Sequence, residues 1–101
     1  MFRHGDVLVL DPIPEPADAA IRGGDVVMEG EVTGHAHRLR GGDVLTGHGR
    51  FACLLRCLAG ATLTHEEHKT VELPKTADGM VYPVIIQREY DDENEWRQVA
   101  D

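Results

Sequence analysis

The sequence predicts an all-β protein, a small antiparallel β-barrel or sandwich in which residues 1–101 form a single domain. Short runs rich in valine, leucine and isoleucine alternate with turns of glycine, proline or acidic residues, which is the pattern of closely spaced β-strands. No long helical segment separates these runs, so antiparallel pairing is favoured over a parallel sheet. A composition of 42% hydrophobic and 28% charged residues is typical of a globular chain.

A glycine-aspartate pair followed by aliphatic residues recurs along the chain and predicts a turn that leads into a strand. Glycine reaches positive φ, aspartate bonds its local backbone, and valine favours a pleated strand. The copies are too weak to define a solenoid repeat, so we interpret them as recurrent strand starts in a meander. They are Gly5-Asp6-Val7-Leu8, Gly24-Asp25-Val26-Val27 and Gly42-Asp43-Val44-Leu45.

In the N-terminal half, strands are expected at 6–10, 26–32 and 35–40. Residues 11–16 contain alternating prolines, which cannot donate regularly to a ladder or continue a helix, so an extended loop is expected there. Residues 17–22 are compatible with one helical turn.

In the C-terminal half, one segment is ambiguous and one is clear. Residues 50–58 fit both helical spacing and strand alternation, and we interpret them as a strand because Gly49 and Gly60 bound so short a run. Residues 81–90 form the strongest candidate, and their apolar side chains on both faces predict a central strand. The strands expected here are 44–46, 50–58, 61–65, 70–73, 81–90 and 95–99.

The charge of the chain argues against a nucleic-acid partner. The formal net charge is −8, and residues 89–101 carry −5 of it. Lys69 and Lys75 are the two lysines, whereas binding to a phosphate backbone draws its affinity from clustered lysine and arginine.

The cysteines and the N-terminal residues indicate a cytoplasmic protein. On a strand, Cys53 and Cys57 would stand roughly 13 Å apart, too far for a disulfide, so we expect buried reduced thiols rather than a ligand or redox pair. The chain opens into a short strand rather than a signal peptide, and no apolar segment approaches the ~20 residues of a membrane span. A reducing, cytoplasmic setting is therefore the default expectation, with no membrane partner.

Two histidine pairs provide the main indication of chemistry. His35 and His37 would project from one side of a strand with Cα atoms about 6.6 Å apart. His65 and His68 share a face if a turn begins at His65, and they point to opposite faces in a continued strand. If the two pairs meet, three or four imidazoles would bind a divalent transition metal ion, with zinc as the default.

Charged neighbours of these histidines suggest finer roles. A three-histidine shell with an open position for water is the catalytic pattern, and Glu66 or Glu67 would then be the candidate base for hydrolysis. Either glutamate could instead ligate, orient an imidazole or remain solvated. Arg38 is the candidate clamp for a small anionic ligand. His4 and His48 are candidate additional ligands.

Two interpretations without a metal remain open. The histidines could line an anion or substrate pocket. Alternatively, the protein is a non-catalytic interaction or assembly module, in which the histidines form a polar patch and unpaired strand edges join copies into a homo-oligomer.

Four motifs together resemble a family of small uncharacterised prokaryotic and phage-type proteins, to which no activity is attached. They are EVTGHAHR at 31–38, HEEH at 65–68, ELP at 72–74 and QREYD at 87–91. The HxH pattern on a β-rich scaffold also resembles part of the cupin metal motif. That resemblance is partial, because cupins place a glutamate shortly after HxH, where this chain has Arg38, Leu39 and Arg40.

Overall fold

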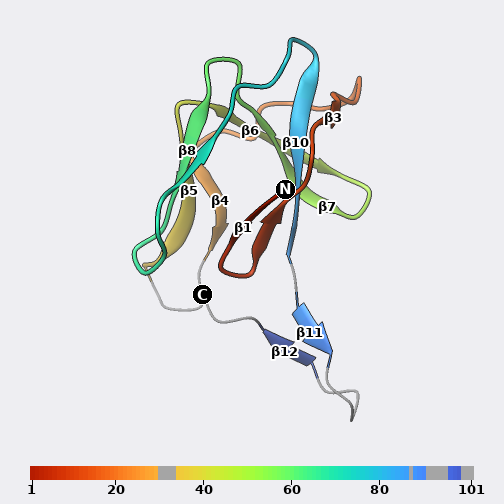
Figure 1. Ribbon diagram of the computed structural model, residues 1–101. Helices are drawn as coiled ribbons and strands as arrows, with labels where there is room; N and C mark the ends of the chain where they lie inside the picture. The colour runs from red at the N-terminus through yellow and green to blue at the C-terminus, as the bar shows by residue number, and fades with distance from the viewer. Residues whose placement is uncertain (30–33, 87, 91–95, 99–101) are drawn as a thin grey trace.

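The regular elements of the structure are β-strands arranged in two main antiparallel sheets (Figure 1). The computed structural model describes residues 1–29, 34–86, 88–90 and 96–98, the last two segments as backbone only. The first sheet has the order β1-β2-β10-β7-β6, with β3 also paired to β10. Its strands are β1 (Phe2–His4), β2 (Val7–Val9), β3 (Ile13–Pro14), β6 (Asp43–His48), β7 (Phe51–Arg56) and β10 (Met80–Ile86).

The second sheet has the order β4-β5-β8-β9, and a separate hairpin pairs β11 with β12. The strands of the second sheet are β4 (Val26–Glu29), β5 (Ala36–Arg40), β8 (Ala61–Thr64) and β9 (Val71–Leu73). The hairpin strands are β11 (Arg88–Tyr90) and β12 (Trp96–Gln98). The arrangement is a sandwich rather than a closed barrel, so the predicted fold class is confirmed.

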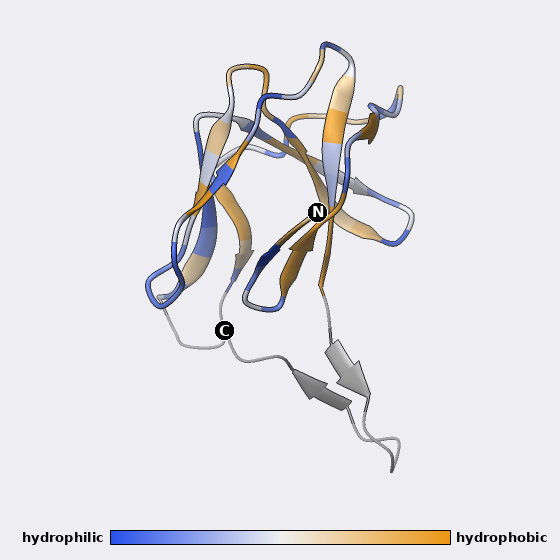
Figure 2. Cartoon of the chain, viewed as in Figure 1, coloured by the Kyte–Doolittle hydropathy of each residue, from blue (hydrophilic) through white to orange (hydrophobic). Residues whose placement is uncertain are grey.

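A shared hydrophobic core joins the two main sheets. Aliphatic side chains of the first sheet, such as Val9 and Val84, belong to the same buried cluster as Leu39 and Leu63 of the second. Figure 2 shows apolar residues concentrated on the strands and polar residues on the connecting loops. Each fully buried aliphatic side chain contributes about 1.5–3 kcal/mol of hydrophobic stabilisation, so this cluster holds the sheets face to face.

The strand predictions at 50–58 and 81–90 are confirmed in kind. Gly49 and Gly60 lie at positive φ on either side of β7, which forms a strand rather than a helix. β10 lies between β2 and β7 as a central strand, and its residues 81–84 are buried. Position 87 and positions 30–33, 91–95 and 99–101, which include parts of three predicted strands, lie outside the described residues.

The predicted helical turn at 17–22 is wrong. The Ala19 amide donates to the Pro16 carbonyl in an isolated turn, and the chain then runs beside β6. There the Thr46 amide donates to the Ala20 carbonyl, and the Arg22 amide donates to the Val44 carbonyl. The outer edge of β6 therefore provides hydrogen-bond partners for these backbone groups, which in a helix would have bonded to one another.

Cys53 and Cys57 are buried free thiols, as predicted. Burial raises the pKa of each thiol to about 11, so both are protonated core side chains at neutral pH. None of the described segments forms a helix of the length and hydrophobicity that a membrane crossing requires. The cytoplasmic location stays a prediction.

Candidate metal centre

Imidazole rings from three distant segments meet at one end of the sandwich. His4 ends β1, His37 lies on β5, and His65 and His68 belong to the loop between β8 and β9. The antiparallel register that pairs Arg38 with Thr64 continues by one step to bring His37 opposite His65. The two histidine motifs therefore meet because β5 and β8 are hydrogen-bonded neighbours (Figure 1).

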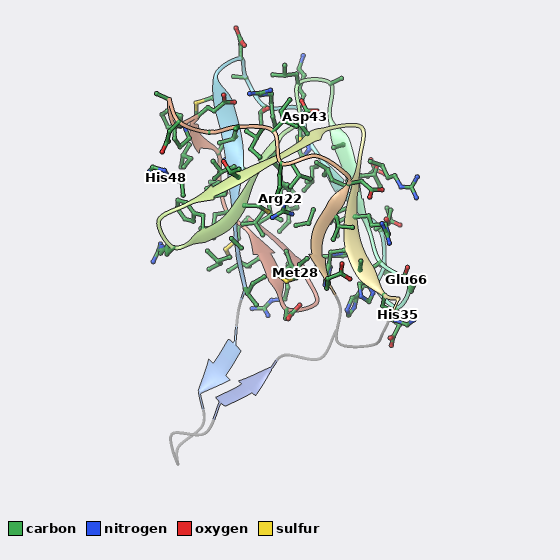
Figure 3. All side chains as sticks on the ribbon, turned by 180° about the vertical axis from the view of Figure 1, so that it is seen from behind. Arg22, Met28, His35, Asp43, His48 and Glu66 are labelled. Carbon is green, nitrogen blue, oxygen red and sulfur yellow. The ribbon has the colours of Figure 1, made fainter. Side chains whose placement is uncertain are left out.

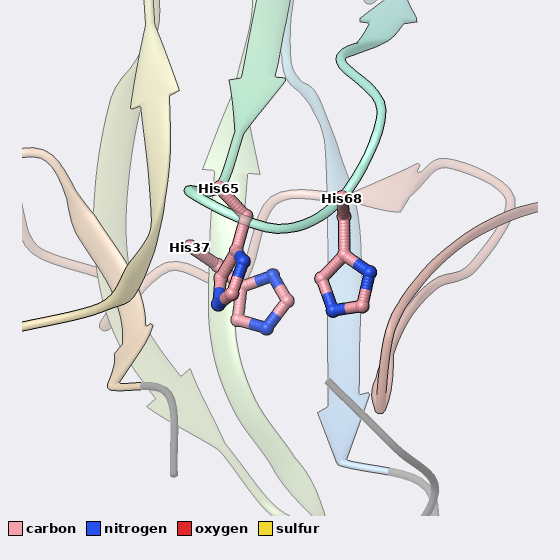
Figure 4. A group of neighbouring side chains, drawn as sticks. All are labelled: His37, His65 and His68. Carbon is pink, nitrogen blue, oxygen red and sulfur yellow. The ribbon is translucent and has the colours of Figure 1, made fainter. Parts of the chain in front are cut away.

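His37, His65 and His68 are the tightest group of possible ligands. The ring centroids of His65 lie 4.5 Å from those of both His37 and His68, and Figure 4 shows the three rings gathered together. One nitrogen of each ring lies within 4.8 Å of the other two. Tetrahedral zinc with nitrogen ligands at about 2.0–2.1 Å needs ligand atoms roughly 3.4 Å apart, so small side-chain rotations would close the group around an ion.

The nitrogens that face this group are shielded from solvent. The Nε2 atoms of His65 and His68 are buried and have no hydrogen-bond partner among the described residues. Buried polar atoms are costly unless something bonds them, so a ligand at this position would stabilise the fold. The Nδ1 atom of His65 has a partner, because it accepts a hydrogen bond of 3.0 Å from the Glu67 amide.

His4 and Asp6 also belong to this buried environment. His4 is 2% exposed, Asp6 is 1% exposed and His37 is fully buried. The Nδ1 atoms of His4 and His37 are 2.8 Å apart, and His4 Nε2 lies 3.1 Å from the carbonyl oxygen of Lys69. On its other side, His37 Nε2 lies 3.5 Å from Asp6 Oδ1.

Burial, together with the nearby His37 and His68 rings, lowers the pKa of His4 from 6.5 to about 4. His4 is therefore neutral at pH 7. A neutral imidazole carries one N–H donor and one acceptor nitrogen, so its hydrogen bonds are directional.

His35 and the two glutamates form an outer rim that anchors the loop. His35 Nδ1 lies 2.8 Å from Glu67 Oε1, and the Ala36 amide donates to Glu66 Oε1 at 2.9 Å. That backbone bond is the main cause of the lowered pKa of Glu66. Figure 3 shows His35 and Glu66 close together on this edge of the molecule. Both glutamates thus tie the HEEH segment to the start of β5.

The structure places the two predicted histidine pairs near each other, but His35 and His37 belong to two different groups of possible ligands. His35, His65 and Glu66 form a second group whose possible ligand atoms lie within 4.8 Å, while His37 belongs to the inner group. The reason is local: β5 begins at Ala36, so His35 precedes the strand and does not follow its alternation. His65 is common to both groups.

Arg38 and His48 lie apart from the inner group. Arg38 donates to Asp25 Oδ1 at 3.1 Å, and strand alternation puts its side chain on the face opposite that of His37. Its role as an anion clamp stays a prediction. His48 lies 3.5 Å from Asp18, on the opposite side of the view in Figure 3 from His35.

Sequence reasoning gave His4 only a minor role and missed Asp6. A usable signal was present, because alternation along β1 places His4 on the same face as Phe2, and that face turns inward. A buried histidine on a strand needs a hydrogen-bond partner. The packing of the β1–β2 hairpin against β5 supplies that partner, His37.

The fold and the buried histidine group define a small β-sandwich domain with a candidate metal centre. The chain belongs to the family described as a domain of unknown function, DUF8820, whose model matches residues 3–87. That range includes His4, His37, His65 and His68. No curated protein and no solved structure matches the chain significantly. Membership of an uncharacterised family is thus confirmed, while the prokaryotic or phage-type motifs and the cupin resemblance stay predictions.

Proposed function

We propose that this domain binds a divalent transition metal ion, with zinc as the default, through His37, His65 and His68. The observation that carries the proposal is the convergence of three imidazole nitrogens within 4.8 Å in a largely solvent-shielded place. Imidazole suits zinc, copper, iron and nickel, whereas calcium and magnesium prefer oxygen ligands. The donor set therefore favours a transition metal.

Charge near the group supports a cation. The buried carboxylate of Asp6 lies 3.5 Å from His37 Nε2. Arg38, the cationic side chain next to His37 in sequence, is paired with Asp25 on the other face of the strand. A metal ion close to His37 would gain attraction from Asp6, and the guanidinium of Arg38 lies on the other face of the strand.

Binding through His65 Nε2 has a structural requirement. A ligand nitrogen needs its lone pair, so His65 must carry its proton on Nδ1 when Nε2 binds the ion. Nδ1 then can no longer accept from the Glu67 amide, and that amide would bond water at the loop surface instead. Metal binding is therefore expected to shift the NMR signal of the Glu67 amide.

Three protein nitrogens leave a fourth position for water, which is the arrangement of catalytic rather than structural zinc sites. We therefore also propose that the metal-loaded protein catalyses hydrolysis by a metal-bound water. Glu67 is the candidate base to test first, because Glu66 Oε1 anchors the loop by accepting from the Ala36 amide. A non-catalytic module that assembles as a homo-oligomer is the alternative without metal.

Elemental analysis of protein purified without an affinity tag tests the proposal. We expect about one zinc per chain, retained in His48→Ala and lost in His68→Ala. His68 is partly exposed in a loop, so its replacement should preserve the fold, which circular dichroism checks. Metal-free protein that takes up no zinc, and whose melting temperature is unchanged by chelator, would overturn the proposal and favour the assembly module.

Hydrolysis needs its own assay on the metal-loaded protein. Zinc-loaded protein should cleave an activated ester or phosphodiester faster than free zinc does, and Glu67→Gln should lower that rate without reducing the zinc content. A rate equal to that of free zinc would remove the hydrolytic part and leave metal binding intact.

A further inference from the structure

We propose that His4 is a positioning residue for this centre, which accepts the Nδ1 proton of His37 and so leaves His37 Nε2 as the nitrogen for the metal. The inference rests on the proposed metal site, but it also states where the protons lie in the metal-free protein. That second statement can be tested without any metal.

The backbone carbonyl of Lys69 fixes the orientation of the proton on His4. A carbonyl oxygen only accepts hydrogen bonds, and it lies 3.1 Å from His4 Nε2. His4 Nε2 therefore carries the N–H. Burial of the ring disfavours its charged form, so with the proton on Nε2 the Nδ1 atom is left as an acceptor.

The proton of His37 follows from that of His4. The two Nδ1 atoms lie 2.8 Å apart in a buried contact, so one of them must donate. His4 Nδ1 accepts, and His37 Nδ1 therefore carries the N–H. The reverse arrangement would place the lone pair of His4 Nε2 against the oxygen of Lys69, a repulsive buried contact.

The second nitrogen of His37 is then the one that binds. His37 Nε2 lies 3.5 Å from Asp6 Oδ1. If His37 is neutral, Nε2 carries the remaining lone pair of the ring, and if the ring is protonated, Nε2 holds a proton towards Asp6 that the ion would displace. In both states Nδ1 remains the donor to His4. A hydrogen bond from the rear nitrogen of a ligand histidine fixes the tautomer and the ring orientation, and its removal commonly lowers metal affinity 10–100-fold.

His4 lies behind His37 rather than within the ligand group. Both of its ring nitrogens are engaged elsewhere, Nδ1 with His37 Nδ1 and Nε2 with the carbonyl oxygen of Lys69. The group of mutually close ligand atoms contains His37, His65 and His68. His4 comes from the first sheet and His37 from the second, so this contact makes the geometry of the centre depend on the β1–β2 hairpin.

Long-range ¹H–¹⁵N NMR of the imidazoles in the chelator-treated protein at pH 7.5 tests the proton positions. We expect His4 to be protonated at Nε2 alone and His37 to be protonated at Nδ1. A His37 ring protonated only at Nε2, or a His4 ring protonated at Nδ1, would overturn the inference. This result stands whether or not the protein binds zinc.

Metal titrations of His4 variants provide the second test. His4→Phe fills the space without an acceptor and should weaken zinc binding about 10–100-fold, whereas His4→Gln supplies an acceptor oxygen and should recover part of the affinity. His48→Ala is the matched control. X-ray absorption should find the same number of nitrogen ligands in the wild type and in His4→Gln, and loss of one ligand would show that His4 binds the ion directly.

The two proposals fail in different ways. No zinc uptake by the wild type would overturn the proposed function, while the tautomer measurement tests the proton positions of His4 and His37 without any metal. Unchanged zinc affinity in a folded His4→Phe protein would overturn the positioning role and leave the metal site in place.

Discussion

The inner histidine group and the second group, which joins His65 to His35 and Glu66 of the outer rim, differ in environment. In the inner group, His37 and His68 contribute nitrogens that lie close together, and the Nε2 atoms of His65 and His68 are shielded from solvent. At the rim, His35 is paired with Glu67, and both side chains are partly exposed. A partly exposed hydrogen-bonded pair is satisfied by itself and by water, whereas gathered nitrogens in a shielded place favour a shared ligand. Position relative to the strand, rather than membership of a motif, separates the two regions.

Replacing one histidine from each region should give the largest contrast. His37→Ala removes a fully buried, hydrogen-bonded ring and should lower the free energy of unfolding by about 2–4 kcal/mol and abolish zinc binding. His35→Ala should cost less than about 1 kcal/mol and keep the zinc. Urea unfolding and zinc titration measure both effects. Equal losses of zinc affinity in the two variants would show that the regions form one site.

Zinc should stabilise the folded protein through the inner group. At a free zinc concentration of about 100 times Kd, the free energy of unfolding should rise by about 2.7 kcal/mol. The rise should persist in Glu66→Gln and vanish in His68→Ala. Thermal unfolding with and without chelator measures this rise. If the stabilisation by zinc persists in His68→Ala, the metal binds at the rim rather than at the inner group.

Acid should destabilise the metal-free protein through His4. The pKa of His4 is 6.5 in the unfolded chain, and burial lowers it to about 4 in the folded protein. The unfolded state therefore binds more protons between these values, and stability should be full above pH 6.5 and fall as the pH drops towards 4. Melting temperatures in chelator check this, and His4→Gln should flatten the decline. Zinc affinity should also fall below about pH 6.5, because the ligand imidazoles must be neutral.

Loss of a rim anchor should have the smallest effect. Glu66→Ala removes the acceptor of the Ala36 amide and should cost about 1 kcal/mol, with zinc affinity changed only a few-fold. Hydrogen exchange of the Ala36 amide should become faster. A complete loss of zinc in this variant would assign Glu66 to the ligand set.

Local patterns predicted the fold well where a strand is bounded by glycines or is apolar on both faces, as in β7 and β10. The same patterns misjudged residues 17–22, because their partner is the distant edge of β6 and no local signal reports it. The convergence of the histidine pairs could be anticipated in outline. The exclusion of His35 from the inner group depends on where β5 begins, and strand ends are poorly determined by composition.

Local reasoning could indicate that His4 faces inward, but not that His4 and Asp6 lie against His37. Both lie on or beside the β1–β2 hairpin, and their proximity to His37 depends on how the first sheet packs against the second. Sequence separation of 33 residues between His4 and His37 gives no indication of that packing. The predicted anion ligand and homo-oligomer also stay predictions, because each requires a partner molecule.

The register between β5 and β8 constrains how the length of this chain can vary. A slip by one residue would send the His37 ring to the opposite face, because strand side chains alternate. Insertions within either strand should therefore disrupt the histidine group. Replacement of Gly42, which follows β5, should also be costly, because a Cβ there would meet the Arg56 carbonyl oxygen at 2.7 Å. The β6–β7 tip is a better place for an inserted peptide, because nothing lies within 4 Å of a Cβ added at Gly49, although its φ of +61° disfavours replacing the glycine itself.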